Sequence, residues 1–220
     1  MKTFIYTFFI LTSILFVSCF DEDYYYEPAH HDGNNSRVTP NQVDTTDTIT
    51  PPTPPAPFAT LRTYYSDDWD NWEISINDTI EGRIRTYFSD DYDYWEFDIG
   101  DYSGTIRTYT SEDWDYWEFE CDNYDISIRT YTSEDWDYWE ITDQNNGFEL
   151  IARTYTSIDW DHWEIYNSVI NLDFYTYTSE DWDYWELYGD VSELETPYII
   201  AAAFIPVFTS SIYIQGVIEE

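Results

Sequence analysis

The sequence predicts an all-β protein: an antiparallel up-and-down meander of six hairpin repeats, with about twelve short strands. Two observations carry this prediction, a repeated sequence phrase and the strand–turn–strand pattern within each copy of it. The phrase RTYTSEDWDYWE occurs at Arg107–Glu118 and again at Arg129–Glu140, and looser copies begin at Arg62, Arg85, Arg153 and Tyr175. Successive copies begin 22 to 24 residues apart, a period typical of one small supersecondary unit that is repeated along the chain.

Each copy has the pattern of a β-hairpin. In Ile126–Thr132, apolar or β-branched residues alternate with polar and aromatic ones, which is the period of a strand. Tyr138–Thr142 alternates in the same way. The intervening Ser133–Trp136 contains turn-forming Ser and Asp. The second observation is therefore a strand, a turn and a strand within every repeat.

A glutamate follows each repeat arginine eleven residues later, and this spacing predicts the register of the hairpin. We expect Arg129 to face Glu140 and Thr130 to face Trp139, with the tyrosines nearer the turn opposite each other on the arginine side. Between repeats, we expect Phe119 to face Ile128. A slip of one residue would place arginine on the tryptophan face, so the register should be well defined.

One tryptophan is invariant in the second strand of every repeat, and the register places all six on one apolar face. These predicted core residues are Trp72, Trp95, Trp117, Trp139, Trp163 and Trp185. A row this apolar must be buried. We favour a closed or nearly closed barrel over a sandwich or a single-layer sheet, because an open sheet leaves an edge and an apolar face exposed. Cys121 is expected to point inward as a small hydrophobe.

The chain divides into four segments by composition. We predict a signal peptide over 1–18, a disordered tether rich in Pro, Thr and Asp over 19–58, and the six-repeat β domain over 59–190. The segment 191–220 is expected to form apolar strands that cap or close the array. A membrane helix is the alternative for 197–218, which contains no charged residue.

The N-terminus carries the marks of an exported lipoprotein. Lys2 precedes the apolar stretch Phe4–Val17, and Ser18-Cys19 follows it. The run Leu15–Cys19 resembles a bacterial lipobox, and the acidic Phe20–Asp23 resembles the surface-export signal of Bacteroidota lipoproteins. The resemblance implies lipidation of Cys19 and a lipid-anchored, surface-exposed place in the outer membrane.

The charge balance restricts the class of partner. The chain has 45 acidic and 8 basic side chains and a formal net charge of −37. Such a charge repels nucleic acid and anionic lipid headgroups, and it favours cations or basic proteins. Aromatic residues make up 21% of the chain, which indicates a folded rather than a disordered acidic protein.

The predicted hairpin tips concentrate carboxylates, and an up-and-down meander places all the tips on one rim. The candidate metal ligands are Asp67, Asp68, Asp70, Asp90, Asp91, Asp93, Glu112, Asp113, Asp115, Glu134, Asp135, Asp137, Asp159, Asp161, Glu180, Asp181 and Asp183. Clustered carboxylates suit calcium, which takes six to eight oxygen ligands. The competing interpretation is turn chemistry, in which Ser and Asp side chains bond nearby backbone amides.

Each tip also contains one aromatic residue. These candidate ligand-binding residues are Trp69, Tyr92, Trp114, Trp136, Trp160 and Trp182. A ring beside a carboxylate suits a cationic group or a sugar. In repeat length and aromatic density the units are similar to the choline- and glucan-binding hairpin repeats of bacterial surface proteins, although they lack the glycines of those families. The competing interpretation is that these rings cover the hairpin ends.

Catalysis finds no support in the pattern, because six equal copies provide no unusual environment for one acid. His162 stands where other repeats carry Tyr, so we expect it to pair with Tyr155. The predicted function is a non-enzymatic, surface-displayed binding or adhesion module, in which the acidic, aromatic rim binds a glycan or a cationic partner. The alternative is a calcium-binding structural or spacer repeat protein without a specific ligand.

Overall fold

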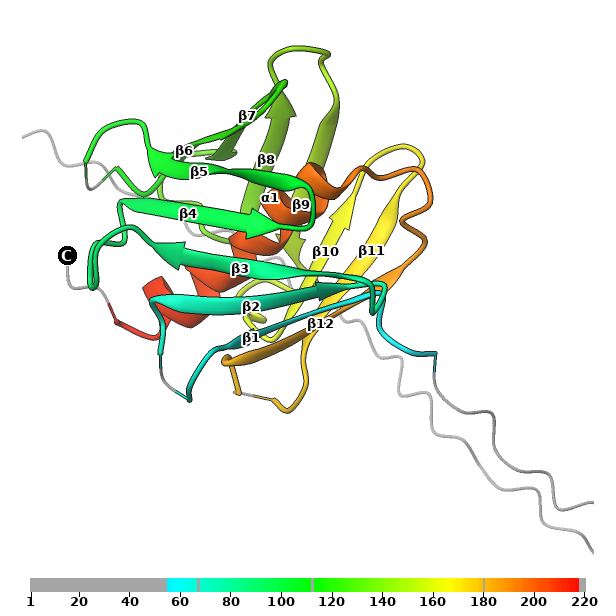
Figure 1. Cartoon of the computed structure of the whole chain (residues 1–220), viewed down its shortest axis with the longest axis horizontal. Helices are drawn as coiled ribbons and strands as arrows, with labels where there is room; N and C mark the ends of the chain where they lie inside the picture. Colours follow the sequence, from blue (N-terminus) through cyan, green and yellow to red (C-terminus); the bar gives the residue numbers. More distant parts are fainter. Residues whose placement is uncertain (1–54, 67, 112, 180, 218–220) are drawn as a thin grey trace, which may run out of the picture. The chain divides into compact units, whose positions relative to one another are not determined.

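The structure is a computed structural model that describes residues 55–66, 68–111, 113–179 and 181–217. Twelve antiparallel strands follow one another in chain order and close into a barrel, with β1 paired to β12 (Figure 1). The strands are β1 Ala59–Thr63, β2 Asn71–Ile76, β3 Ile80–Thr86, β4 Tyr94–Ile99, β5 Tyr102–Thr108, β6 Tyr116–Cys121, β7 Tyr124–Thr130, β8 Tyr138–Asp143, β9 Glu149–Thr154, β10 His162–Tyr166, β11 Asn171–Thr176 and β12 Tyr184–Gly189. The predicted fold class and the preference for a closed barrel are confirmed.

The alternation in sequence sets the two faces of the barrel wall. In β8, for example, Trp139 and Ile141 are buried while Tyr138 and Glu140 are partly exposed. All six invariant tryptophans point into the barrel, and their side chains are no more than 1% exposed. The prediction of these six residues as core is therefore confirmed, and so is the inward position of Cys121, which is 3% exposed.

The register within each hairpin is also as predicted. Arg129 lies opposite Glu140 and Thr130 opposite Trp139. The guanidinium of Arg129 donates from Nε and Nη2 to Oε2 of Glu140, at 3.1 and 2.8 Å. These pairs are solvent-exposed, so each contributes no more than about 1 kcal/mol. Their main consequence is that they mark the outer face of the wall.

The predicted register between repeats is wrong by two residues. Phe119 lies opposite Ile126 rather than Ile128, and Ile128 lies opposite Trp117. The same offset recurs at every junction between repeats. Closure explains it, because strands in a barrel tilt against the axis and successive pairs must be staggered. An offset of two keeps every side chain on its own face.

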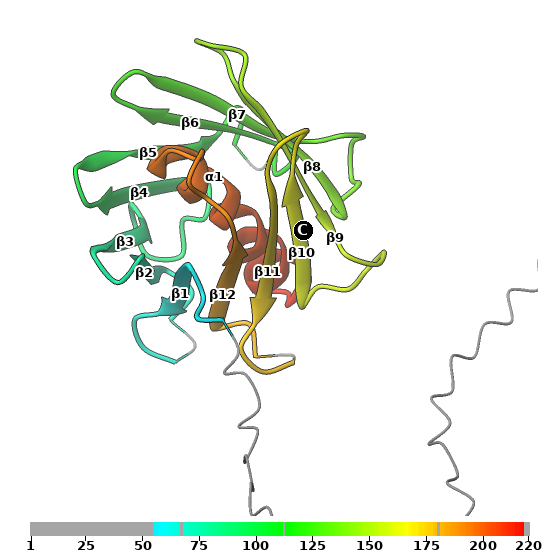
Figure 2. The ribbon, with the colours of Figure 1, turned by 90° about the vertical axis from the view of Figure 1, so that its right-hand side faces the viewer.

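The C-terminal segment is helical, so the prediction of capping or closing strands is wrong. An α-helix, α1, spans Thr196–Pro206, and a π-helix, η1, continues over Val207–Ile214. Together they form the one helix, among the described residues, that is long and apolar enough to cross a membrane, but 89% of its most apolar window is buried inside the protein. It runs along the lumen of the barrel (Figures 1 and 2).

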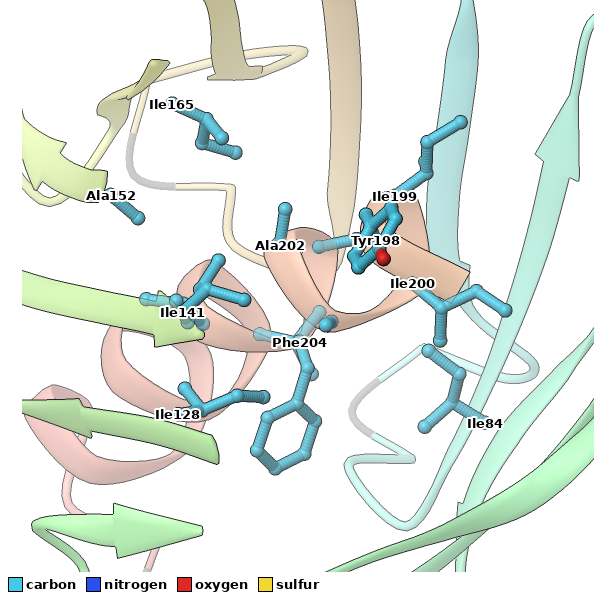
Figure 3. Packing of buried hydrophobic residues seen from close by; sticks show 14 of the residues in the cluster. Ile84, Ile128, Ile141, Ala152, Ile165, Tyr198, Ile199, Ile200, Ala202 and Phe204 are labelled. Atoms are coloured by element: carbon cyan, nitrogen blue, oxygen red, sulfur yellow. The ribbon is translucent and has the colours of Figure 1, made fainter. Parts of the chain in front are cut away.

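The physical reason for this helix is the width of the barrel. A ring of twelve strands encloses more space than inward tryptophans fill, and an α-helix with its side chains is about 10–12 Å across. A helix that is apolar on all sides is stable where every side is buried. Phe204 of α1 contacts the rings of Trp95 and Trp117, and Figure 3 shows it among inward isoleucines of the wall such as Ile128.

Polar residues of η1 satisfy two buried indoles of the wall. Ser210 Oγ accepts a hydrogen bond from Trp163 Nε1 at 3.0 Å, and Ser211 Oγ accepts one from Trp185 Nε1 at 3.1 Å. At the other end of the helix, the Tyr198 hydroxyl donates to the buried carboxylate of Asp143 at 2.7 Å. The helix is thus held at both ends of the lumen.

The two ends of the barrel differ in what they present. One end carries the six loops within the repeats, which we call the tip end. The other carries the short turns between repeats, and here Phe58 leads into β1 with its N–H bonded to Leu187 O at 2.7 Å. The segment that precedes β1 therefore enters the barrel at the end opposite the tips.

Candidate functional site

The tip loops share one backbone geometry. In the fourth repeat, Asp135 N–H donates to Thr132 O at 2.9 Å and closes a four-residue turn. The third residue of this turn, Glu134, has a φ of 63°, the left-handed value that a type II turn requires at this position. Asp90 and Ile158 have the same conformation in their own repeats. The loop geometry is therefore repeated, even where the residue is poorly suited to it.

A closed ring of hydrogen bonds joins the six tips. The tip serine of each repeat donates from Oγ to Oδ2 of the last tip aspartate of the preceding repeat, over 2.5 to 3.3 Å. The pairs are Ser66–Asp183, Ser89–Asp70, Ser111–Asp93, Ser133–Asp115, Ser157–Asp137 and Ser179–Asp161. This serine–aspartate ring confirms that all the tips lie on one rim, and it assigns the last acid of each tip a structural role.

Backbone donors reinforce the ring. The N–H of Glu134 donates to both carboxylate oxygens of Asp115, at 3.0 and 3.3 Å, and the N–H of Ile158 donates to Asp137 at 3.2 Å. The carboxylate thus stabilises the left-handed residue of the next tip. These bonds run between repeats and involve the last acid of each tip, so they differ from the local turn chemistry that the sequence suggests for Asp113 and its equivalents.

The remaining tip acids face solvent. Asp90, Asp113, Glu134 and Asp181 are exposed, and Asp68, Asp91, Asp135 and Asp159 are half-buried. Three of the candidate metal ligands lie outside the described residues: Asp67, Glu112 and Glu180. Within the part of the chain that the structure describes, no three His, Cys, Asp or Glu side chains come together as a metal-binding group. Calcium binding stays a prediction.

Two tip carboxylates have raised pKa values, Asp183 in the last repeat and Asp68 in the first. A hydrogen bond with Asp181 raises the pKa of Asp183, with burial as a further cause. Burial, together with the charge of Asp70, raises the pKa of Asp68. Both shifts have the direction expected for carboxylates with a like charge nearby, so the tip end retains uncompensated negative charge.

The predicted rim aromatics lie at the mouth of the lumen. Trp69, Trp114, Trp136, Trp160 and Trp182 are half-buried and pack against the core, and Tyr92 is 8% exposed. The ring of Trp114 stacks on Phe208 with the centroids 5.5 Å apart, and that of Trp136 lies 4.1 Å from Tyr213. Only parts of these rings face solvent, in agreement with the interpretation that they cover the hairpin ends.

The exposed aromatic surface belongs to other residues, which the sequence analysis did not assign to a site. They form a belt around the outside of the tip end, the tyrosine collar: Tyr64, Tyr65, Tyr87, Phe88, Tyr109, Tyr131, Tyr155 and Tyr177, between 37% and 68% exposed. Tyr131 packs edge-on against Tyr138, with ring centroids 5.1 Å apart. The sequence contains a signal for it, because the tyrosine of RTYT directly follows an inward threonine such as Thr130 and so points outward.

His162 takes the place of the second tyrosine in the fifth repeat. Its ring stacks on Tyr155 with centroids 4.4 Å apart, as predicted, and Nε2 lies 2.9 Å from Oδ1 of Asp173. Cys19, the predicted lipidation site, lies outside the described residues.

Comparison of the chain with protein-family models, with curated proteins and with solved structures gave no match.

Proposed function

We propose that the protein is a non-enzymatic binding or adhesion module, displayed at the cell surface by an N-terminal lipid anchor, whose tip end binds a cationic protein or peptide. The support is the combination at one end of the barrel of exposed tyrosine rings and exposed carboxylates. The tips contain no lysine or arginine to neutralise them. The net charge of −37 would speed the approach of a basic partner.

The protein itself contains the kind of contact that we propose. Arg83 lies over the ring of Tyr64, with Cζ 4.3 Å from the centroid, and Nη2 is 3.6 Å from Glu73. Arg153 lies 5.1 Å over Tyr166 and pairs with Glu164 at 2.8 Å. A guanidinium held by a ring and a carboxylate is thus a contact that this wall already makes, worth about 0.5–1 kcal/mol at an exposed site.

The point at which the chain enters the barrel leaves the tips accessible. Phe58 bonds to Leu187 at the end opposite the tips, so the segment that precedes β1 does not cover them. Six similar tips offer repeated contacts, and several weak contacts together give useful avidity.

The test is binding of an oligoarginine peptide to the full chain, followed by calorimetry at two salt concentrations. The triple variant Asp90→Asn, Asp113→Asn and Glu134→Gln removes three exposed tip charges and leaves the serine–aspartate ring intact. We expect it to bind more weakly and with a smaller dependence on salt.

A matched control removes the same number of charges at the opposite end. Asp78→Asn, Asp101→Asn and Asp122→Asn change exposed residues of the turns between repeats, so the net charge equals that of the tip variant. We expect near-normal binding from this control. Equal weakening by both variants would show that the peptide responds to net charge alone and would refute a site at the tips.

A calcium-loaded spacer is the second proposal, and the crowded carboxylates of Asp181 and Asp183 favour it, because a cation would relieve their repulsion. The measurement is the melting temperature of the full chain with calcium and with chelator. Binding to the native state raises the melting temperature, so an unchanged value would remove this proposal.

A further inference from the structure

The outer wall of the barrel carries a groove that is separate from the tips. It lies over β12, β1, β2 and β3 and has a volume of about 470 Å³, within the range of small-ligand sites. Its polar lining includes Thr60, Arg62, Glu73, Ser75, Arg83 and Tyr184. The groove is found where the first repeat meets the last, so its surroundings differ from those of the other repeats.

The floor of the groove is a pair of small hydroxyl residues. Thr60 and Ser75 lie directly opposite each other on β1 and β2. At the equivalent of Ser75 the fifth and sixth repeats carry the larger Tyr166 and Tyr188. The groove is therefore a consequence of small side chains at a place that these two repeats fill with a tyrosine ring.

One other repeat has a comparable pair, and there the chain covers it. Ser127 and Thr142 lie opposite each other at the same place in the fourth repeat. Gln144 lies over this pair and donates from Nε2 to Ser127 Oγ at 2.9 Å and to Thr142 O at 3.4 Å. This contact shows the chemistry that the position accepts, which is a neutral polar group with hydrogen-bond donors.

The charged groups along the groove are the paired Arg62, Glu73 and Arg83, together with the exposed Glu81, which lies opposite Ser75. Arg62 donates from Nε and Nη2 to Glu73 Oε2 at 3.2 and 2.9 Å, and Arg83 approaches Glu73 Oε1 at 3.6 Å. Such a cluster carries little net charge toward a ligand, but it presents fixed donors and acceptors side by side. Adjacent hydroxyls of a sugar ring match this arrangement, whereas a net anion or cation gains little from it.

We propose that this groove binds a neutral sugar unit of a glycan, a hexose or an N-acetylhexosamine. The hydroxyls of Thr60 and Ser75 and the Arg62–Glu73 pair supply the hydrogen bonds, and the ring of Tyr184 borders the site. The proposal goes beyond the function proposed for the tips, since it uses a different surface and a different ligand.

The test fills the groove with a residue that the fold already tolerates. Ser75→Tyr introduces the side chain that the fifth and sixth repeats carry at the equivalent position, Tyr166 and Tyr188. Thr142→Tyr, at the equivalent position of the fourth repeat, is the matched control, because it adds the same ring away from the groove and changes no charge. Saturation-transfer NMR on the full chain, with cellobiose, lactose and N,N′-diacetylchitobiose as separate probes, measures binding.

We expect at least one of these disaccharides to bind the unmodified chain and the Thr142→Tyr variant equally. Ser75→Tyr should weaken that binding roughly tenfold or more, the equivalent of about 1.4 kcal/mol. The proposal is overturned if none of the three disaccharides binds, or if Ser75→Tyr binds as the unmodified chain does. Because Ser75→Tyr leaves the tips unchanged, binding of the oligoarginine peptide reports on the function proposed for the tips independently.

Discussion

Three consecutive residues of η1 provide a graded test of the helix in the lumen. Thr209, Ser210 and Ser211 are all fully buried, but their hydroxyls differ in what they bond. Ser210 Oγ is the partner of Trp163 Nε1, whereas Trp185 Nε1 donates both to Ser211 Oγ and to Trp182 O, at 3.1 and 3.0 Å. Removal of the hydroxyl at each of the three positions should therefore change the free energy of unfolding by unequal amounts.

The magnitudes follow from these partners. Ser210→Ala leaves the indole N–H of Trp163 buried without its acceptor, which costs about 1–3 kcal/mol. Ser211→Ala removes hydrogen bonds but leaves Trp185 bonded to Trp182 O, so the loss should be about 0.5–1.5 kcal/mol. Among the described atoms, Thr209 Oγ1 has no hydrogen-bond partner, so Thr209→Val, which removes a buried unpaired hydroxyl, should be neutral or stabilising.

Urea unfolding of the three variants measures these differences. With a slope of about 2 kcal/mol/M, a loss of about 2 kcal/mol lowers the midpoint of Ser210→Ala by about 1 M. The midpoint of Ser211→Ala should fall less, and that of Thr209→Val should not fall. Equal effects at the three positions, or the largest loss at Thr209, would refute the placement of η1 against Trp163 and Trp185.

Three further predictions concern single residues. Ile158 is β-branched, 70% exposed and has a φ of 60°, so Ile158→Asn should raise the free energy of unfolding by about 1 kcal/mol; an unchanged urea midpoint would argue against this conformation. Asp181 and burial raise the pKa of Asp183, so as the pH falls Asp183 is protonated in the native state before it is protonated in the unfolded state. The free energy of unfolding of the wild type therefore increases as the pH falls from neutral through the carboxyl pKa. Asp183→Asn should therefore be more stable than wild type at neutral pH, with a difference that shrinks on acidification through the carboxyl pKa; a constant difference would contradict this. Burial raises the pKa of the Cys121 thiol to about 11, so in a Cys19→Ser variant it should react with a thiol reagent at pH 8 only after unfolding, and stoichiometric labelling of the native protein would exclude the buried position.

The hairpins could be predicted from sequence because their determinants are local. The constant spacing of Arg129 and Glu140 fixes which residues face each other, and alternation fixes which side of the wall they occupy. The offset between Trp117 and Ile128 could not be obtained in this way. It depends on the closure of the whole ring, which no single repeat encodes.

The C-terminal helix could not be predicted from its own residues, because its conformation also depends on the closed barrel. The β-branched residues of Val207–Ile214 favour strands, and their helical conformation results from burial inside the barrel. Pro197, at the first turn of α1, and the run Ala201–Ala203 were local signals for a helix. The apolar character on all sides is equally typical of a membrane segment, and the lumen that buries this helix exists only once the whole ring of strands has closed.

The site was predicted in outline only. The sequence predicts Ser133 as a turn former, but its hydrogen bond to Asp115 crosses between repeats, so a single hairpin gives no sign of it. The sequence predicts Trp136 as a ligand-binding residue, yet its ring packs on Tyr213 of the C-terminal helix. The well-exposed ring of that repeat is instead the outward Tyr131.

Hydrogen exchange of the full chain in solution, followed by mass spectrometry, tests most directly that the six hairpins close around the C-terminal helix. The backbone amides of Thr196–Ile214 should exchange as slowly as those of the central strands, because they open only when the barrel unfolds. Rapid exchange of this segment in a protein whose strands stay protected would contradict the account.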